Sequence, residues 1–439
     1  MIGATSALGD LRAMVGAEFL VTGEALEAYR LGGRKPQAAI VPADDVEVSK
    51  TLTRAWEEGL AVVPWGGGTH QSVGPPPSRY DLALDLGRLN RLLVHEPADM
   101  TATAQAGIRM VELQRQLAQH RQFLPLDVPL PERAMLGGVL SARSSGPLRC
   151  RYGTARDLVL GLRVAHADGT LTKSGAKVVK NATGYDVTKL YLGSHGTLGV
   201  ILEATLRVYP RPDVEQGWWL AAHDLGTAQT LADRILGSSL VPNRAEMVDE
   251  DAGRACRMPG PGLVVSISGL PETVQGQRAT LERMAAESGV MPAEIRDAEG
   301  TWRALSDFPW VNVGWNGGGM RALWRGGAPP ADCAKAMLAI RQAAPRSVGV
   351  SAAASVAHGI LRGGFLAEAP EAVAHGLRAA REVLVAIGGF LTVLDAPAPV
   401  RAQVDEWGPA PDGVGVMQRL KTAFDPKGIL NPGRFVGGI

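Results

Sequence analysis

The stretch VVPWGGGTHQSVG, residues 62–74, places three consecutive glycines directly after a short apolar run. Glycine lacks a Cβ atom, so a ligand can approach the backbone amides of such a loop closely. No lysine follows in the Walker spacing, and Pro75–Pro77 prevent the helix that a dinucleotide fingerprint requires. The next apolar run, Leu82–Leu86, alternates as a strand does. The sequence therefore predicts strand, glycine loop and strand, with the loop either an anion site formed by successive N–H groups or a tight turn.

Composition excludes several classes of protein. The 439 residues suffice for two or three domains, and 46% of them are hydrophobic, so a large buried core is expected. With 45 basic and 44 acidic residues, the chain has no charge excess for binding nucleic acid. We also find no signal peptide and no uncharged apolar run of the roughly 18 residues that a membrane span requires. Cys150, Cys256 and Cys333 lie far apart, which excludes an internal Cys-x-x-Cys metal or iron–sulfur site and favours a reducing, cytoplasmic location.

The pattern along the chain predicts an α+β protein. A hairpin is expected over residues 157–175, because Asp168-Gly169 suits a two-residue turn between alternating strands. From about Arg211, predicted helices alternate with predicted strands, which indicates a second α+β domain. The chain ends in a helix followed by Pro- and Gly-rich turns. Helices are expected over 44–60, 110–120, 272–288, 332–343 and 370–387, and domains over 1–210, 211–395 and 396–439.

Two more glycine clusters follow the first. They are PLPERAMLGGVLSARSSGPLRCRYGTARDLVLGL (129–162) and KNATGYDVTKLYLGSHGTLGVILEA (180–204). Three such loops, each bracketed by strands, are too many for ordinary turns. They suit one long anionic ligand held between two subdomains.

Four motifs carry a resemblance that covers essentially the whole chain. They are P-x-G-G-G-T at Pro64–Thr69, R-Y-G-x-x-R-D at Arg151–Asp157, G-S-x-G-T-L-G at Gly193–Gly199 and D-P-x-G-I-L-N-P-G-R at Asp425–Arg434. The chain resembles the flavoprotein family typified by vanillyl-alcohol oxidase and the D-lactate and D-2-hydroxyglutarate dehydrogenases. This resemblance implies a two-subdomain FAD-binding domain of the PCMH type, an α+β cap domain and a C-terminal tail that returns to the FAD domain.

The resemblance also implies which residues hold FAD. The first loop would surround the pyrophosphate, and the second glycine cluster would let the cofactor approach the backbone closely. The residues after the third cluster would contact the adenine or ribityl end of the cofactor. Asn431 would reach the flavin ring, or it is simply a turn former in N-P-G. Arg156 and Asp157 are expected to form a structural ion pair. The cofactor-binding residues predicted in this way are Pro64, Gly66, Gly67, Gly68, Thr69, His70, Gly137, Gly138, Ser141, Gly199, Val200, Ile201 and Asn431.

His70 decides between covalent and non-covalent FAD. Some family members bond the flavin through a histidine in this loop, usually directly after the glycines, but here Thr69 intervenes. We therefore expect non-covalent FAD, with His70 a polar residue of the loop lining.

The second domain departs from the metal-dependent enzymes of the family. They carry H-x-G-D-G-N-L-H, whose two histidines hold a divalent metal, whereas the corresponding stretch here is SVAHGILRGGFLAE (355–368). Only His358 matches, and one histidine is too few for a useful transition-metal site, so no metal is expected. The candidates for contact with substrate are Arg321, Arg325, His358 and Arg362. The arginines suit a carboxylate, or else they are interface or solvated side chains.

Within the family, this pattern resembles the metal-less flavin subunits of bacterial glycolate oxidases. That resemblance implies an FAD subunit of a glycolate- or D-lactate-oxidising complex, with a second, metal-containing FAD subunit and an iron–sulfur subunit as partners. It would be cytoplasmic, or held at the inner membrane through those partners. Two alternatives remain open. One is a self-sufficient FAD-dependent 2-hydroxy-acid dehydrogenase, and the other is a non-catalytic flavin scaffold or electron-relay subunit.

Overall fold

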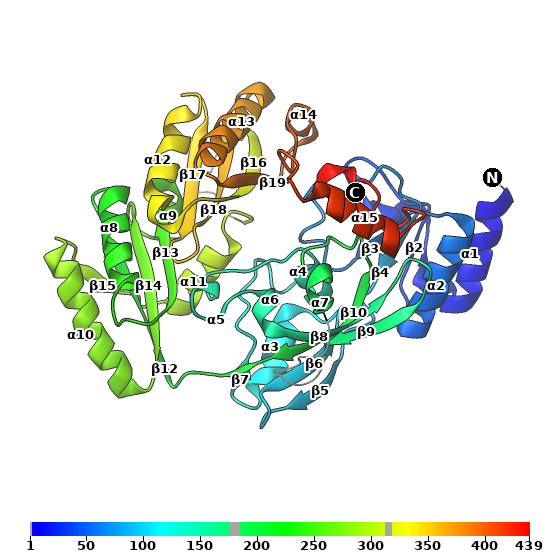
Figure 1. The fold of residues 1–439 in the computed structure, drawn as a ribbon, viewed down its shortest axis with the longest axis horizontal. Helices are drawn as coiled ribbons and strands as arrows, with labels where there is room; N and C mark the ends of the chain where they lie inside the picture. The colour runs from blue at the N-terminus through cyan, green and yellow to red at the C-terminus, as the bar shows by residue number, and fades with distance from the viewer. Residues whose placement is uncertain (1, 176–184, 312–317) are drawn as a thin grey trace.

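The computed structural model describes residues 2–175, 185–311 and 318–439, and it places three main sheets side by side (Figure 1). The first glycine loop belongs to a four-stranded sheet of order β1-β2-β4-β3, in which β2, β4 and β3 run parallel. Asp44 caps the helix before the loop by accepting from the Glu47 amide at 2.9 Å. The elements here are α1 (Ile2–Val15), β1 (Leu20–Val21), β2 (Ala38–Ile40), α2 (Asp45–Glu58), β3 (Val62–Trp65) and β4 (Leu82–Asp85).

The parallel pairing of β3 and β4 removes one of the two interpretations of the loop. Val62 pairs with Leu82 in the same direction, so the intervening segment crosses from one end of the sheet to the other. A tight turn can join only antiparallel neighbours. The glycine loop is therefore part of a long crossover connection.

The second sheet is antiparallel, in the order β5-β6-β10-β8-β9. Its β8–β9 hairpin confirms the prediction for residues 157–175, with Ala165 opposite Leu171.

The predicted ion pair of Arg156 with Asp157 is wrong, because Asp157 instead accepts from the Thr154 amide at 2.8 Å and caps a helical turn. Residues 180–184 of the third glycine cluster lie outside the described residues. The elements are β5 (Leu92–Glu96), β6 (Thr101–Gln105), α3 (Met110–Ala118), β7 (Gln122–Phe123), α4 (Leu136–Ser141), α5 (Arg149–Tyr152), α6 (Ala155–Leu158), β8 (Val159–Ala165), β9 (Leu171–Gly175), α7 (Thr188–Tyr191), β10 (Val200–Arg207) and β11 (Tyr209–Pro210).

The third sheet has eight strands in the order β15-β12-β14-β13-β17-β18-β16-β19 and forms the cap. Its outer face is covered by α8, α10, α12 and α13 (Figure 1), whereas α9 and α11 pack on the other face with Trp219 and Ala353. The elements are β12 (Val214–Ala221), α8 (Leu225–Leu236), β13 (Pro242–Val248), α9 (Glu250–Ala255), β14 (Gly262–Gly269), α10 (Pro271–Glu287), β15 (Pro292–Glu294), α11 (Ala298–Asp307), β16 (Met320–Gly327), α12 (Cys333–Ala343), β17 (Gly349–Ser355), β18 (Ile360–Ala367), α13 (Pro370–Ala386) and β19 (Phe390–Asp395).

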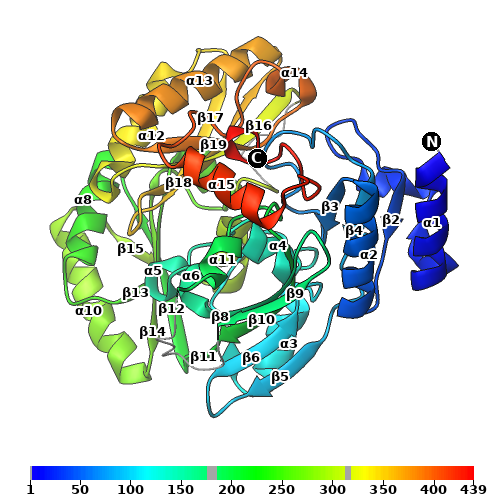
Figure 2. The ribbon, with the colours of Figure 1, turned by 45° about the vertical axis from the view of Figure 1, so that its right-hand side comes forward.

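After β19 the chain returns to the glycine loop. Figure 2 shows α15 (Val414–Phe424) between the cap and the sheet that contains β3, following the short α14 (Ala398–Arg401). The Val62 amide donates to Ile429 O at 2.8 Å, and the Asn431 amide donates to Val62 O at 2.9 Å, so the tail adds a short parallel pairing beside β3. The α+β fold predicted from the sequence, with a two-part first half, a cap and a returning tail, is confirmed.

Candidate functional site

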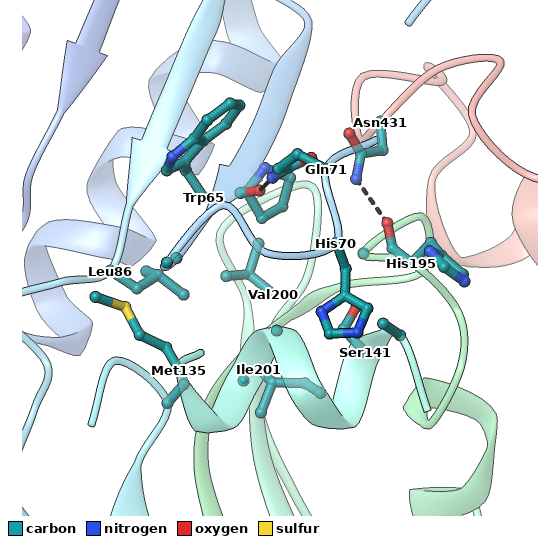
Figure 3. Close-up of a pocket in the computed structure, with 18 of the residues that line it drawn as sticks. Trp65, His70, Gln71, Leu86, Met135, Ser141, His195, Val200, Ile201 and Asn431 are labelled. Atoms are coloured by element: carbon teal, nitrogen blue, oxygen red, sulfur yellow. Dashed lines mark hydrogen bonds between the residues drawn. The ribbon is translucent and has the colours of Figure 1, made fainter. Parts of the chain in front are cut away.

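One pocket lies where the first loop, α4, the start of β10 and the tail meet (Figure 3). Every residue that the sequence assigns to FAD lines it, including both ends of the prediction, Pro64 and Asn431. Figure 3 shows His70 and Ser141 on one side of the pocket and Trp65 and Met135 on the other. The sequence did not single out nine further lining residues: Trp65, Gln71, Leu86, Ala106, Met135, Ala142, His195, Gly196 and Arg434.

The glycines of this pocket serve different purposes. Gly68 has φ 70°, which favours glycine, whereas a Cβ atom on Gly67 would lie 1.7 Å from Arg133 O. Gly137 packs closely too, since its Cβ atom would lie 2.7 Å from the Cβ atom of Ala106. Gly138 is the exception, because a Cβ atom there would meet nothing within 4 Å. Its open side belongs to the pocket, so Gly138 keeps space for a ligand.

Asn431 combines the two roles that its sequence context allows. Its φ of 47° makes it a left-handed turn residue, and its Nδ2 atom donates to His195 O at 2.6 Å (Figure 3). Its Oδ1 atom is buried, and no group in the described ranges donates to it. A buried acceptor without a partner is costly, so this oxygen is available to an N–H group of a bound ligand.

Two histidines that line the pocket are held neutral. Burial, together with nearby Arg325, lowers the pKa of His70 to about 4. Burial, followed by the charges of Arg434 and Arg325, lowers the pKa of His195 to about 3. His70 Nδ1 lies 3.0 Å from Thr69 Oγ1, and its ring packs edge-on against Trp310. At neutral pH both imidazoles can accept a hydrogen bond but carry no charge.

The tail and the cap fix the far end of the loop. The Arg434 guanidinium is almost fully buried and donates to Gln71 O and Val73 O, both at 2.9 Å. Arg401 donates to Ser72 O at 2.6 Å and pairs with Glu406 at 2.5 Å. Residues far apart in sequence thus hold the loop in one conformation.

The cap candidates differ in what they contact. Arg362 is bound within the protein, since its Nη2 atom lies 2.7 Å from Oε2 of the fully buried Glu246. Arg325, on β16, lies directly opposite Arg362 on β18, and Arg321 lies four residues before Arg325 on the same strand. His358 is exposed in the turn between β17 and β18. The structure therefore brings Arg325, but not His358, toward the loop.

The described residues contain neither a cluster of metal ligands nor a membrane-spanning helix. Across 2–175, 185–311 and 318–439, no group of three or more His, Cys, Asp or Glu side chains could hold a metal ion. Within the same ranges, no helix is both long and apolar enough to cross a membrane.

Comparison with known proteins agrees with this geometry. A family described as FAD binding domain matches residues 36–175, and one described as FAD linked oxidases, C-terminal domain, matches residues 406–435. The two matches cover the loop, α4 and the returning tail. In these two segments the chain is similar to the FAD-linked oxidases. The chain is an oxidoreductase, and its cofactor is FAD.

Several similar proteins are named for 2-hydroxy acids. The chain is 27% identical to the glycolate oxidase subunit GlcD of Bacillus subtilis, over 91% of this chain and 88% of that protein. It is 31% identical to the mitochondrial D-lactate dehydrogenase (cytochrome) of Arabidopsis thaliana, over 63% of this chain and 50% of that protein. The solved structure of p-cresol methylhydroxylase superposes with a TM-score of 0.77 at 17% identity, covering 99% of this chain and 97% of that one, which shows the shared fold.

Proposed function

We propose that this chain is the FAD-binding subunit of a complex that oxidises glycolate or D-lactate. Electrons would leave through an iron–sulfur partner, and a second, metal-containing FAD subunit would belong to the same complex. The observation that supports this proposal best is an asymmetry. The FAD pocket has its full set of predicted residues, whereas the cap offers arginines and, in its described part, no cluster of metal ligands. The complex would be cytoplasmic, or peripheral at the inner membrane through its partners.

The chain's own residues would hold the cofactor in three ways. The amides of Gly66–Gly68 and Thr69 would donate to the pyrophosphate, because successive N–H groups form an anion-binding concavity. Gly138 would leave room beside α4, and Asn431 Oδ1 would accept from a ring N–H group. Bound FAD supplies an acceptor for two electrons.

One observation favours the self-sufficient dehydrogenase as a second candidate. Oxidation of an alcohol requires a proton acceptor, and His70 is an uncharged imidazole in the pocket, although burial and Arg325 lower its pKa to about 4 and so make it a weak base. The scaffold or relay alternative has no such support.

The partners can be tested by isolating the protein from its own cells at natural expression level. We expect a second FAD-containing chain and an iron–sulfur protein in constant ratio to this chain. Recovery of this chain alone, with full glycolate-oxidising activity, would favour the self-sufficient dehydrogenase.

The attachment of FAD gives a separate prediction. We expect acid precipitation to release all of the flavin into the supernatant, because Thr69 separates the glycines from His70 and the His70 ring is held by Thr69 and Trp310. The measurement is absorbance at 450 nm of the supernatant and of the redissolved pellet. Flavin that stays with the pellet in the wild type, but not in His70→Ala, would prove a covalent bond.

A further inference from the structure

We propose that Arg149 and Arg325 together form a binding site for a small carboxylate at the junction of the cap and the FAD domain. This inference rests on the proposed function and deepens it, because it gives this chain its own metal-free contact with an acidic substrate. Arg149 comes from α5 of the first half and Arg325 from β16 of the cap, so the site exists only where the two halves meet.

The cap side of the site is fixed by contacts with the glycine loop. Leu323 packs with Leu394 against Val73, just beyond the glycines, and Ser72 Oγ donates to Leu394 O at 2.9 Å. Side chains two residues apart on a strand point to the same face. Arg325 therefore faces the FAD domain, as Leu323 does.

The other side is fixed by α5. Arg151 Nη1 donates to Asn243 Oδ1 at 2.9 Å, and Cys150 Sγ lies 3.7 Å from Pro242 O, so α5 is docked on β13. Arg149 begins this helical turn, and its charge interacts with those of Glu246, Arg143 and Arg362. Several guanidinium groups from both halves thus converge.

The buried carboxylate in this region is already bound by other groups. Glu246 Oε2 accepts from Arg362 at 2.7 Å, and Glu246 Oε1 accepts from Ser355 Oγ at 2.5 Å. By contrast, the side chains of Arg149 and Arg325 form no hydrogen bond or ion pair with any described residue, and the Nε atom of each is buried without a partner. Burial, and then the charges of Arg149 and Arg143, lower the pKa of Arg325 to about 10. A half-buried guanidinium whose Nε atom has neither a partner nor access to water is unfavourable, and a carboxylate matches its paired donors.

The ligand is distinct from FAD. Neither Arg149 nor Arg325 lines the pocket that contains the residues assigned to FAD, although the charge of Arg325 reaches His70 in that pocket. An anion bound between the two arginines would therefore lie outside the FAD pocket, on its cap side.

The test uses the FAD-loaded protein and oxalate, an unreactive dicarboxylate. Binding is measured by calorimetry and by the change in the flavin absorption spectrum, in the wild type, Arg149→Ala, Arg325→Ala and Arg325→Lys. Arg283→Ala, on the exposed α10, is the control. We expect both alanine variants to bind oxalate at least about tenfold more weakly, Arg325→Lys to bind with intermediate affinity, and the control to match the wild type.

Three outcomes would overturn the inference. They are a wild type that binds no oxalate, alanine variants that bind it as the wild type does, and variants whose defect is loss of FAD, which would make the arginines cofactor contacts. FAD content and partner co-purification are measured on the same preparations. If both remain normal while oxalate does not bind, the carboxylate site is refuted and the proposed function stands.

Discussion

Replacing Gly138 with leucine is expected to abolish FAD retention while leaving the protein folded. A side chain at this position meets no protein atom within 4 Å of its Cβ atom, and Gly138 lines the pocket, so the leucine would occupy cofactor space. We expect FAD affinity to fall at least about 100-fold, which corresponds to about 2.7 kcal/mol. The free energy of unfolding of the FAD-free protein should rise by up to about 1 kcal/mol, because leucine is a better helix former than glycine.

A matched control separates the two effects. Gly276 lies in the exposed helix α10, and a Cβ atom there also meets nothing within 4 Å. Gly276→Leu should therefore raise the free energy of unfolding by a similar amount while the FAD content stays normal. The measurements are the flavin-to-protein ratio and chemical denaturation of the FAD-free proteins. Normal FAD content in Gly138→Leu would mean that the pocket is not the cofactor site.

Gly67 is a poorer position for this test than the sequence indicates. The glycine-rich loop predicts that any branched side chain there blocks the phosphate. In the structure a Cβ atom on Gly67 would overlap with Arg133 O, which lies 1.7 Å away, so Gly67→Val would disturb the backbone whether or not FAD binds. Within the loop, Gly68 is the glycine that adopts a left-handed conformation, with φ 70°.

Local patterns made much of this fold predictable. The alternating strands around Asp168-Gly169, the capped helix after Asp44 and the tail helix each depend on neighbouring residues, and each is found within a few residues of its expected bounds. The FAD-site residues were assigned through motifs rather than by geometry, and the structure brings them all to one pocket.

Contacts between distant residues were not predictable in the same way. Nothing in the local sequence indicates that β3 and β4 are parallel, or that Arg434 closes on Gln71 and Val73. Arg149 was missed because its role depends on α5 docking against β13 of another domain. In the sequence Arg149 stands two residues before the R-Y-G motif, in GPLRCRYG. This position does not by itself indicate a contact with the cap.

The second large effect concerns the rate of substrate oxidation. Removing a hydride equivalent from a 2-hydroxy acid requires a base at the hydroxyl group and something that orients or acidifies it. In this chain the arginines can hold the carboxylate, but the described residues include no metal-binding group to acidify the hydroxyl. A Lewis-acid metal contributes several kcal/mol, and each 1.36 kcal/mol is a factor of about ten in rate. We therefore expect reduction of this chain's own flavin to be at least about 100-fold slower in isolation than flavin reduction in the assembled complex.

Anaerobic single-turnover reduction by glycolate and by D-lactate tests the central claim most directly. Bleaching at 450 nm is followed in a stopped-flow instrument, with the isolated FAD-loaded chain in one experiment and the complex purified from its own cells in the other. Rapid bleaching in the complex and slow or absent bleaching in the isolated chain is the predicted result. Equally rapid bleaching in the isolated chain, lost in Arg325→Ala, would contradict the partner-dependent account and make this chain a complete dehydrogenase.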